Sequence, residues 1–212
     1  MAIYRSRSPL RLGFGGGGSD LSPFVETYGG YVLNATINKY VHVSLSPRAD
    51  DIIGITSNDY DLDIKYDAKS SLPYDGNLDL VKAVINRLRS RIPHRIPGFD
   101  LFIRSDMPPG AGLGTSSAVV VAIIAVMNEW LASEMDELEI ADMAYMIERI
   151  DMKLAGGKQD QYAAAVGGFN FMEFRQSGAV IINPLKIKKS VRDELEENLM
   201  LCYTGMIHKS ED

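Results

Sequence analysis

The chain has 212 residues, of which 46% are hydrophobic and 24% are charged, and its net charge is −6. These proportions are ordinary for a soluble globular protein and fit one large domain or two small ones. The acidic balance argues against nucleic-acid binding, which usually leaves a basic surface. A single cysteine, Cys202, excludes an internal disulfide, so we expect a buried thiol and a cytoplasmic location.

No segment predicts a secretory signal or a membrane span. The first seven residues lack the apolar stretch of a signal peptide. The longest apolar run, residues 118–127, is too short to cross a bilayer. We therefore expect no membrane partner.

The first half of the chain predicts strands and one helix. Apolar runs favour strands at residues 31–37 and 40–45. Helical spacing of apolar residues predicts a helix over 78–88, with Pro93 just beyond its end. Alternating apolar residues then predict a strand at 99–103.

Helices are prominent in the second half. Residues 116–131 are apolar on nearly every side, so this helix should be buried. Asp136 and Glu139 form a capping-box pattern that opens a helix running to about Arg149. Another helix is expected at 161–166, and strand-like runs lie at 169–174, 180–182 and 199–204. Strands and helices intermix without strict alternation, which predicts an α+β domain with a mixed sheet packed against helices.

The most informative segment is a glycine-rich loop that leads into the buried helix. Bare backbone and a helix N-terminus present N–H groups and a positive dipole end to an anion. The hydroxyls that follow could cap the helix and also reach a phosphate or its metal. The loop has neither the P-loop lysine nor the dinucleotide-binding spacing. A nucleotide-phosphate site is predicted, with a simple glycine-rich turn as the alternative, at Pro109, Gly110, Ala111, Gly112, Leu113, Gly114, Thr115, Ser116 and Ser117.

A second glycine-rich stretch lies near the N-terminus, at residues 15–18. Bare backbone there would let a ligand lie directly against the chain. Asp20 could accept hydrogen bonds from the hydroxyls of a polyol, and Arg11 could supply positive charge near a transferring group. The alternative is a flexible loop with a surface arginine and a capping aspartate. On the functional hypothesis, the substrate would contact Gly16, Gly17, Ser19 and Asp20.

Two carboxylates follow the capping-box helix. Glu148 should lie in its last turn, where a carboxylate opposes the helix dipole and could instead bind Mg²⁺. The alternative is a surface glutamate paired with Arg149 or Lys153. Asp160 starts the next helix after a pair of glycines. It could be an N-cap, or it could accept the proton of an attacking hydroxyl.

In this order the three clusters resemble those of the GHMP small-molecule kinases, a family that includes galactokinase, homoserine kinase and mevalonate kinase. The resemblance implies that ATP binds at the glycine-rich loop and that Ser116 and Glu148 share a Mg²⁺. It also implies that Asp160 faces the acceptor hydroxyl. Arg11 falls where the first motif of the family carries a basic residue, so Asp160 and Arg11 are the expected catalytic residues.

Residues 156–164 and 167–172, with the N-terminal glycines, resemble the heptose 7-phosphate kinases within this family, and the fucokinases are near neighbours. The resemblance implies phosphate transfer from ATP to the anomeric hydroxyl of a sugar phosphate. Lys158 precedes Asp160 by two residues and would then bind the distal phosphate of the sugar. The alternative is a solvated lysine in a glycine turn.

Family members usually continue into a second domain with a third glycine-rich motif, and nothing after Gly205 resembles that motif. We therefore expect residues 1–212 to be the nucleotide-binding portion of a longer protein, with about 185–212 leading toward a C-terminal domain. The alternatives are a short homologue with impaired catalysis and a non-catalytic domain that binds nucleotide or sugar phosphate. The sequence does not fix the oligomeric state, and a homodimer is one expectation.

Overall fold

A computed structural model describes residues 2–91, 96–202 and 205. The strands formed by these residues are β1 Tyr4–Gly15, β2 Gly30–Pro47, β3 Ile52–Ser57, β4 Leu62–Asp67, β5 Phe99–Ser105, β6 Phe169–Phe174 and β7 Val180–Pro184. The helices are α1 Phe24–Tyr28, α2 Asp79–Arg91, α3 Thr115–Leu131, α4 Glu137–Tyr145, α5 Gln159–Val166 and α6 Lys189–Asn198. A π-helical segment, η1 Met146–Asp151, continues α4.

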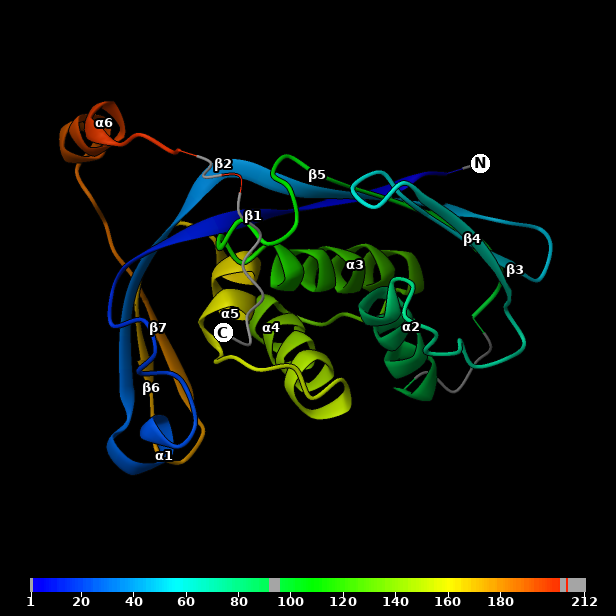
Figure 1. Cartoon of the computed structure of the whole chain (residues 1–212), viewed down its shortest axis with the longest axis horizontal. Coiled ribbons are helices and arrows are strands. Elements are labelled where there is room, and N and C mark those ends of the chain that lie inside the picture. Colours follow the sequence, from blue (N-terminus) through cyan, green and yellow to red (C-terminus); the bar gives the residue numbers. More distant parts are fainter. Residues whose placement is uncertain (1, 92–95, 203–204, 206–212) are drawn as a thin grey trace.

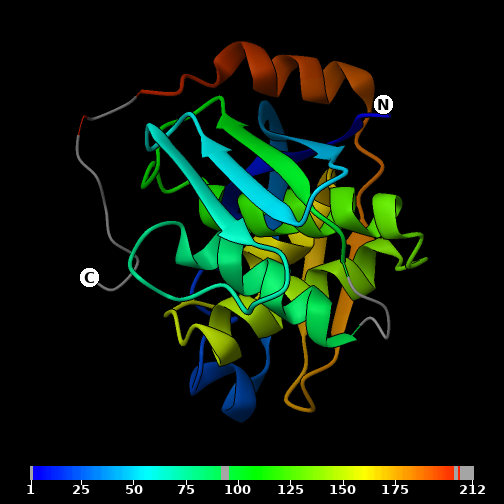
Figure 2. The same cartoon turned by 90° about the vertical axis from the view of Figure 1, so that its right-hand side faces the viewer.

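The strands form one sheet, and helices α2 to α5 pack against one of its faces (Figures 1 and 2). The order is β4-β3-β5-β2-β6-β7, and β1 pairs with β2. Strands β3 and β5 run parallel, whereas the other pairs are antiparallel. The predicted α+β fold with a mixed sheet is therefore confirmed.

Strand β2 is the centre of the sheet. Its C-terminal half pairs with β5 and its N-terminal half pairs with β6, while β1 pairs along both halves. The sequence predicted two separate strands here because polar residues 38 and 39 interrupt the apolar pattern. The backbone instead stays extended, and the register with β1 shifts between Pro9 and Arg11.

Several elements were not predicted from the sequence. Strand β1 includes the start of the expected N-terminal loop, so Arg11 lies on a paired strand rather than in a flexible segment. Strands β3 and β4 form a hairpin in which β4 alternates between half-buried and exposed residues. Helix α1 has only five residues and helix α6 buries no side chain, so neither has the long apolar stripe from which a helix is predicted.

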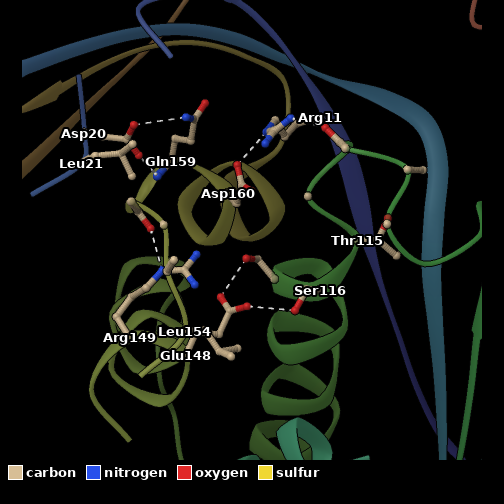
Figure 3. A pocket seen from close by; sticks show the side chains of 18 of the residues that line it. Arg11, Asp20, Leu21, Thr115, Ser116, Glu148, Arg149, Leu154, Gln159 and Asp160 are labelled. Carbon is tan, nitrogen blue, oxygen red and sulfur yellow. Dashed lines mark hydrogen bonds and ion pairs between the residues drawn. The ribbon is translucent and has the colours of Figure 1, made fainter. Parts of the chain in front are cut away.

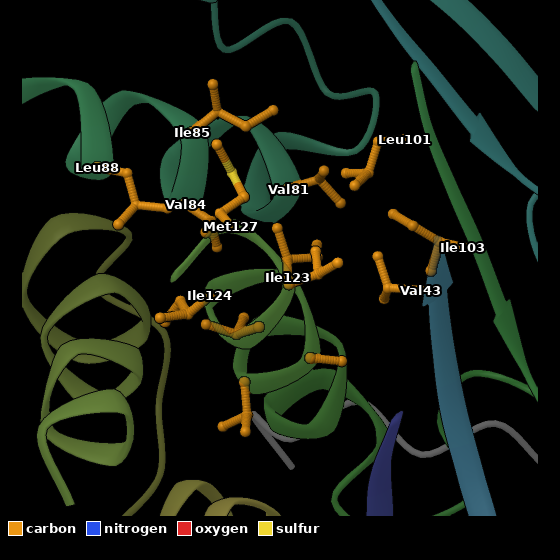
Figure 4. Close-up of a cluster of buried hydrophobic side chains, with 14 of the residues drawn as sticks. Val43, Val81, Val84, Ile85, Leu88, Leu101, Ile103, Ile123, Ile124 and Met127 are labelled. Atoms are coloured by element: carbon orange, nitrogen blue, oxygen red, sulfur yellow. The ribbon is translucent and has the colours of Figure 1, made fainter. Parts of the chain in front are cut away.

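The main core lies between the sheet and helices α2 and α3 (Figure 4). Val43, Leu101 and Ile103 on β2 and β5 face Ile123 and Met127 on α3. Helix α3 buries residues around most of its circumference, as its uniformly apolar sequence predicts. Burial of this helix places its N-terminus beside β1 and β2. In the described part of the chain, no helix is long and apolar enough to span a membrane.

The C-terminal expectations need correction. Residues 199–202 do not form a strand, and Cys202 is exposed rather than buried. Residues 203 and 204, the rest of the expected strand, lie outside the described residues. The apolar run has no covering layer because the preceding helix α6 lies away from the layer of α2 to α5 (Figure 1). The connection from about 185–212 to a further domain stays a prediction.

Candidate active site

A cavity of about 640 Å³ lies where β1, η1 and the N-terminal ends of α3 and α5 meet (Figure 3). Residues from all three predicted clusters line it, although they are distant in the sequence. The residues in its wall that bear on the chemistry are Arg11, Asp20, Gly110, Gly112, Gly114, Thr115, Ser116, Ser117, Glu148, Arg149, Gln159 and Asp160.

The glycine-rich loop forms one wall of the cavity. Gly110, Gly112 and Gly114 have φ values of 76°, 72° and 74°, which residues with side chains rarely adopt. Gly114 is the N-cap of α3, and no side chain caps the helix, so the predicted hydroxyl cap is wrong. The first hydrogen bond within α3 is donated by the N–H of Ala118 to Gly114 O, at 3.0 Å. The N–H groups that precede Ala118 in the first turn therefore have no acceptor within the helix. They form the kind of site that binds anions.

Most of the predicted loop residues line the cavity, from Pro109 to Ser117. Leu113 does not line it, because its side chain is buried in the core. Its carbonyl oxygen accepts a hydrogen bond of 3.0 Å from the backbone N–H of Arg11. The loop is therefore bound to β1 through Leu113, while its glycines face the cavity.

Arg11 links the loop to α5. Its Nε lies 2.6 Å from Asp160 Oδ1, and its Nη1 donates to Gly112 O at 2.9 Å. The side chains of Arg11 and Asp160 are 18% and 21% exposed. Lys158 is the N-cap of α5, so the N-cap alternative for Asp160 is wrong. Asp160 instead lies in the first turn and points into the cavity (Figure 3).

Glu148 lies in η1, which follows the predicted capping box and α4. Its side chain is only 1% exposed. Oε1 accepts a hydrogen bond of 3.1 Å from Ser116 Oγ, and Oε2 accepts one of 2.7 Å from Ser117 Oγ. Gln161 Nε2 also donates to Oε2. The alternative of a surface glutamate paired with Arg149 is therefore wrong.

The donors around Glu148 fit a magnesium ion. Mg²⁺ takes hard oxygen ligands, usually one or two carboxylates together with substrate phosphates and waters. Glu148 and Ser116 supply a carboxylate and a hydroxyl on the cavity wall, at the N-terminal end of α3. Within the described ranges, no lysine or arginine forms an ion pair with Glu148. The described residues also contain no group of three or more metal-binding side chains, which a site completed by phosphates does not require.

Asp20 lies on the other side of the cavity and is 3% exposed. Its Oδ2 accepts from the backbone N–H of Gln159 at 3.0 Å, and its Oδ1 accepts from Gln159 Nε2 at 3.2 Å. Asp20 thus fixes the start of α5, and its contact with a polyol stays a prediction. Gly16, Gly17 and Ser19 do not line the cavity. They form the turn that leads to Asp20, so their placement does not support direct substrate contact.

Lys158 also lies outside the cavity wall. Its Nζ donates to Gly178 O at 2.8 Å and lies 4.8 Å from the centre of the Tyr145 ring. Positions two residues apart on a helix point roughly 200° apart. Asp160 faces the cavity, so Lys158 faces away from it. This placement does not support the prediction that Lys158 binds a distal phosphate.

Sequence reasoning gave no role in the site to Gln159, Gln161 or Arg149, and the structure shows that Gln159 lines the cavity and binds Asp20. Gln161 is fully buried beside Glu148, and a polar residue within an apolar helix could have indicated it. Arg149 was considered only as a partner of Glu148, and nothing in the local sequence shows that it lines the cavity.

Comparison with known proteins places this arrangement in a family. Residues 79–168 match the profile of the GHMP kinases N-terminal domain. The chain therefore contains a GHMP kinase N-terminal domain, which confirms the resemblance seen in its motifs.

Two relatives with more than 40% identity to this chain are heptose kinases. D-glycero-alpha-D-manno-heptose 7-phosphate kinase of Campylobacter jejuni is 44% identical over 212 residues, which cover 100% of this chain and 62% of that protein. The crystal structure of a D-glycero-D-manno-heptose 1-phosphate kinase from Bacteroides thetaiotaomicron has a TM-score of 0.89 and 46% identity, covering 92% of this chain and 63% of that one. The chain thus spans about three fifths of the length of these relatives.

A more distant relative is the bifunctional fucokinase/GDP-fucose pyrophosphorylase of Arabidopsis thaliana. It is 26% identical over 215 residues, which cover 94% of this chain and 20% of that protein. The likeness therefore extends beyond the heptose kinases.

Proposed function

We propose that the protein containing this chain is an ATP-dependent kinase that phosphorylates the anomeric hydroxyl of D-glycero-D-manno-heptose 7-phosphate to give the 1,7-bisphosphate. The identity of 44% with a heptose 7-phosphate kinase over the whole chain supports the choice of sugar. One structural observation supports phosphate transfer most directly. An ideal Cβ placed on Gly114 would lie 3.4 Å from Asp160 Oδ2, so this carboxylate borders the glycine-rich loop.

In this proposal, the loop residues bind the triphosphate of ATP. Backbone N–H groups at the start of α3 would donate to phosphate oxygens, and the helix dipole would favour their negative charge. Ser116 and Glu148 would hold Mg²⁺, which supplies positive charge to the phosphates when bound. Gln161 and Ser117 would keep the Glu148 carboxylate oriented toward the cavity.

Asp160 would orient the acceptor and take its proton. Arg11 fixes Oδ1, and Oδ2 has no hydrogen-bond partner among the described residues. The anomeric hydroxyl would donate to Oδ2, and its oxygen would attack the γ-phosphorus of ATP. The new oxygen–phosphorus bond forms as the bond to the β,γ-bridging oxygen breaks. ADP leaves, and the hydroxyl proton passes to Asp160.

Two alternatives are kept. Another sugar-1-kinase, of the fucokinase or galactokinase type, is supported by the fucokinase relative. A non-catalytic domain that binds nucleotide or sugar phosphate has less support, because binding alone does not require the Arg11–Asp160 pair beside the loop. The homodimer, the C-terminal domain and the cytoplasmic location expected from the sequence stay predictions.

The test is an assay of the full-length parent protein with Mg-ATP and a panel of acceptors. The panel contains D-glycero-D-manno-heptose 7-phosphate, the same heptose without phosphate, fucose and galactose. We expect the highest kcat/KM with the heptose 7-phosphate. A higher value with fucose or galactose would favour the first alternative, and no product with any acceptor would overturn the kinase proposal.

A further inference from the structure

The cavity has few positive groups for the ligands that it is proposed to hold. Its charged lining residues are Arg11, Asp20, Glu148, Arg149 and Asp160. ATP and a sugar phosphate would add several negative charges to three carboxylates. Arg11 already contacts Asp160 and Gly112 O. Among the described residues that line the cavity, Arg149 is the other positively charged one, and it forms no ion pair.

Arg149 reaches the cavity from η1 (Figure 3). Its Nε donates to Gly157 O at 3.2 Å, and no hydrogen bond or ion pair engages its two Nη groups within the described part of the chain. The guanidinium group is thereby held at one nitrogen and free at two. A planar fork of this kind can donate two parallel hydrogen bonds to a phosphate.

The paired glycines next to Arg149 provide the room for its side chain. An ideal Cβ on Gly156 would lie 2.6 Å from Arg149 Nη2, so a side chain there would displace the guanidinium group from this position. A Cβ on Gly157 would lie 2.0 Å from Asp20 Oδ2. The first glycine therefore admits the guanidinium, and the second lets this segment pack against Asp20. The glycine pair, which the sequence analysis treated only as the turn before α5, thus also contacts the side chain of Arg149.

We propose that Arg149 binds the phosphate group of a phosphorylated sugar acceptor and so selects sugar phosphates over free sugars. This inference rests on the proposed kinase function. Arg149 takes the place that the sequence suggested for Lys158, whose ammonium group is turned toward Gly178 O.

The position of Arg149 favours the acceptor over the nucleotide. Arg149 lies on the side of the cavity that carries Asp20 and Gln159, whereas Thr115 and the glycine-rich loop lie across from it (Figure 3). The loop provides its own N–H donors for the nucleotide phosphates. A phosphate on the acceptor would reach Arg149 while the attacked hydroxyl lies at Asp160 between the two walls.

The test compares Arg149→Met, Arg149→Lys and Arg87→Met in the full-length parent protein. Arg87 is the matched control because it pairs with Asp151 of the same π-helical segment at 3.2 Å but does not line the cavity. KM and kcat are measured separately for ATP, for heptose 7-phosphate and for the unphosphorylated heptose. Calorimetry with heptose 7-phosphate in the absence of nucleotide provides a readout that does not need turnover, and circular dichroism checks folding.

Arg149→Met should raise KM for heptose 7-phosphate roughly ten- to a hundredfold, because it removes charge-assisted hydrogen bonds to the phosphate. KM for ATP and kcat/KM for the free heptose should change less than about twofold, as should every constant of Arg87→Met. Arg149→Lys keeps the charge without the fork, so it should recover part of the loss.

An increase confined to the KM for ATP would place the guanidinium on the nucleotide and overturn the inference. Equal losses with phosphorylated and free heptose, or no loss, would also overturn it. If Arg149→Met does not fold, the same comparison is made with Arg149→Lys. Absence of wild-type turnover with every sugar would instead overturn the proposed function, and calorimetry would still decide whether Arg149 binds the sugar phosphate.

Discussion

Lys82 and Arg149 are two cations of this domain with opposite surroundings. The side chain of Lys82 is fully buried, and its Nζ lies 2.6 Å from Asp75 Oδ1 and 2.7 Å from Asp79 Oδ1. Arg149 has one backbone acceptor and lies on an open cavity. Asp75 and Asp79 neutralise the charge of Lys82, so this cluster stabilises the fold. Arg149 keeps free donors, which serve a ligand.

The same contrast holds for the carboxylates. The hydrogen bond from Lys82 lowers the pKa of Asp75 from its ordinary value of 3.8 to about 2. Glu148 is far more enclosed than Asp75, and its partners are neutral hydroxyl and amide donors rather than a cation. A buried carboxylate without a protein cation is therefore a better indicator of a functional site here than a buried ion pair.

The largest effect is expected for Asp160→Asn. The amide cannot accept the proton of the acceptor hydroxyl, so kcat of the parent protein should fall roughly 10²–10⁴-fold. The melting temperature should stay close to that of the wild type, because Arg11 keeps Gly112 O as a partner. Steady-state kinetics and thermal unfolding measure the two properties. Near-normal turnover would contradict the catalytic role and would show that Asp160, like Lys82, has only a structural role.

Glu148→Gln should raise the Mg²⁺ concentration needed for half-maximal turnover by roughly ten- to a hundredfold. The substitution keeps the size of the side chain but removes the charge that the proposed ion requires. Titration of activity with Mg²⁺ at saturating ATP measures this requirement. If the Mg²⁺ dependence were unchanged and only the stability fell, Glu148 would have a structural role and would not bind the ion.

Lys82→Met should destabilise the protein by about 2 kcal/mol without changing KM for either substrate. The methionine fills the buried space, but Asp75 and Asp79 lose their cation. The loss should stay moderate because both carboxylates are partly exposed to water. Urea unfolding of the parent protein compares the midpoints, and a changed KM would contradict the separation of the two regions.

The sequence predicted the lining of the cavity better than the buried cluster around Lys82. Loop residues such as Gly112 and Ser116 were identified because a bare loop before an apolar helix has few other uses. Lys82 gave no signal, since a lysine in an amphipathic helix is usually solvated. The placement of Lys158 and Arg149 also needed the structure. Which of two nearby cations faces a cavity depends on the helix phase and on contacts with distant residues.

The acid sensitivity of the Lys82 cluster gives a smaller effect. Because the folded pKa of Asp75 is depressed to about 2, its contribution to stability is present above about pH 4 and is lost as the pH falls toward 2. Asp75→Asn should therefore be less stable than the wild type at pH 7, and the difference should shrink toward pH 2. Urea midpoints at pH 7, 4 and 3 measure it, and a constant difference would contradict the account.

The smallest effect is expected for Lys158→Met. Its ammonium group contacts Gly178 O and the Tyr145 ring outside the cavity, so KM for the sugar phosphate should change less than about twofold. The kinetic assay used for Arg149 measures it. A selective rise in the KM for the sugar phosphate would restore Lys158 as the phosphate ligand and weaken the contrast drawn with Arg149.

The most direct measurement is the ³¹P NMR spectrum of the product formed by the full-length parent protein from ATP and heptose 7-phosphate. The account predicts two phosphate signals on the sugar, one of them coupled to the anomeric proton, in equal amounts with released ADP. ADP release without a new sugar phosphate, or a newly added phosphate on a carbon other than the anomeric one, would contradict it.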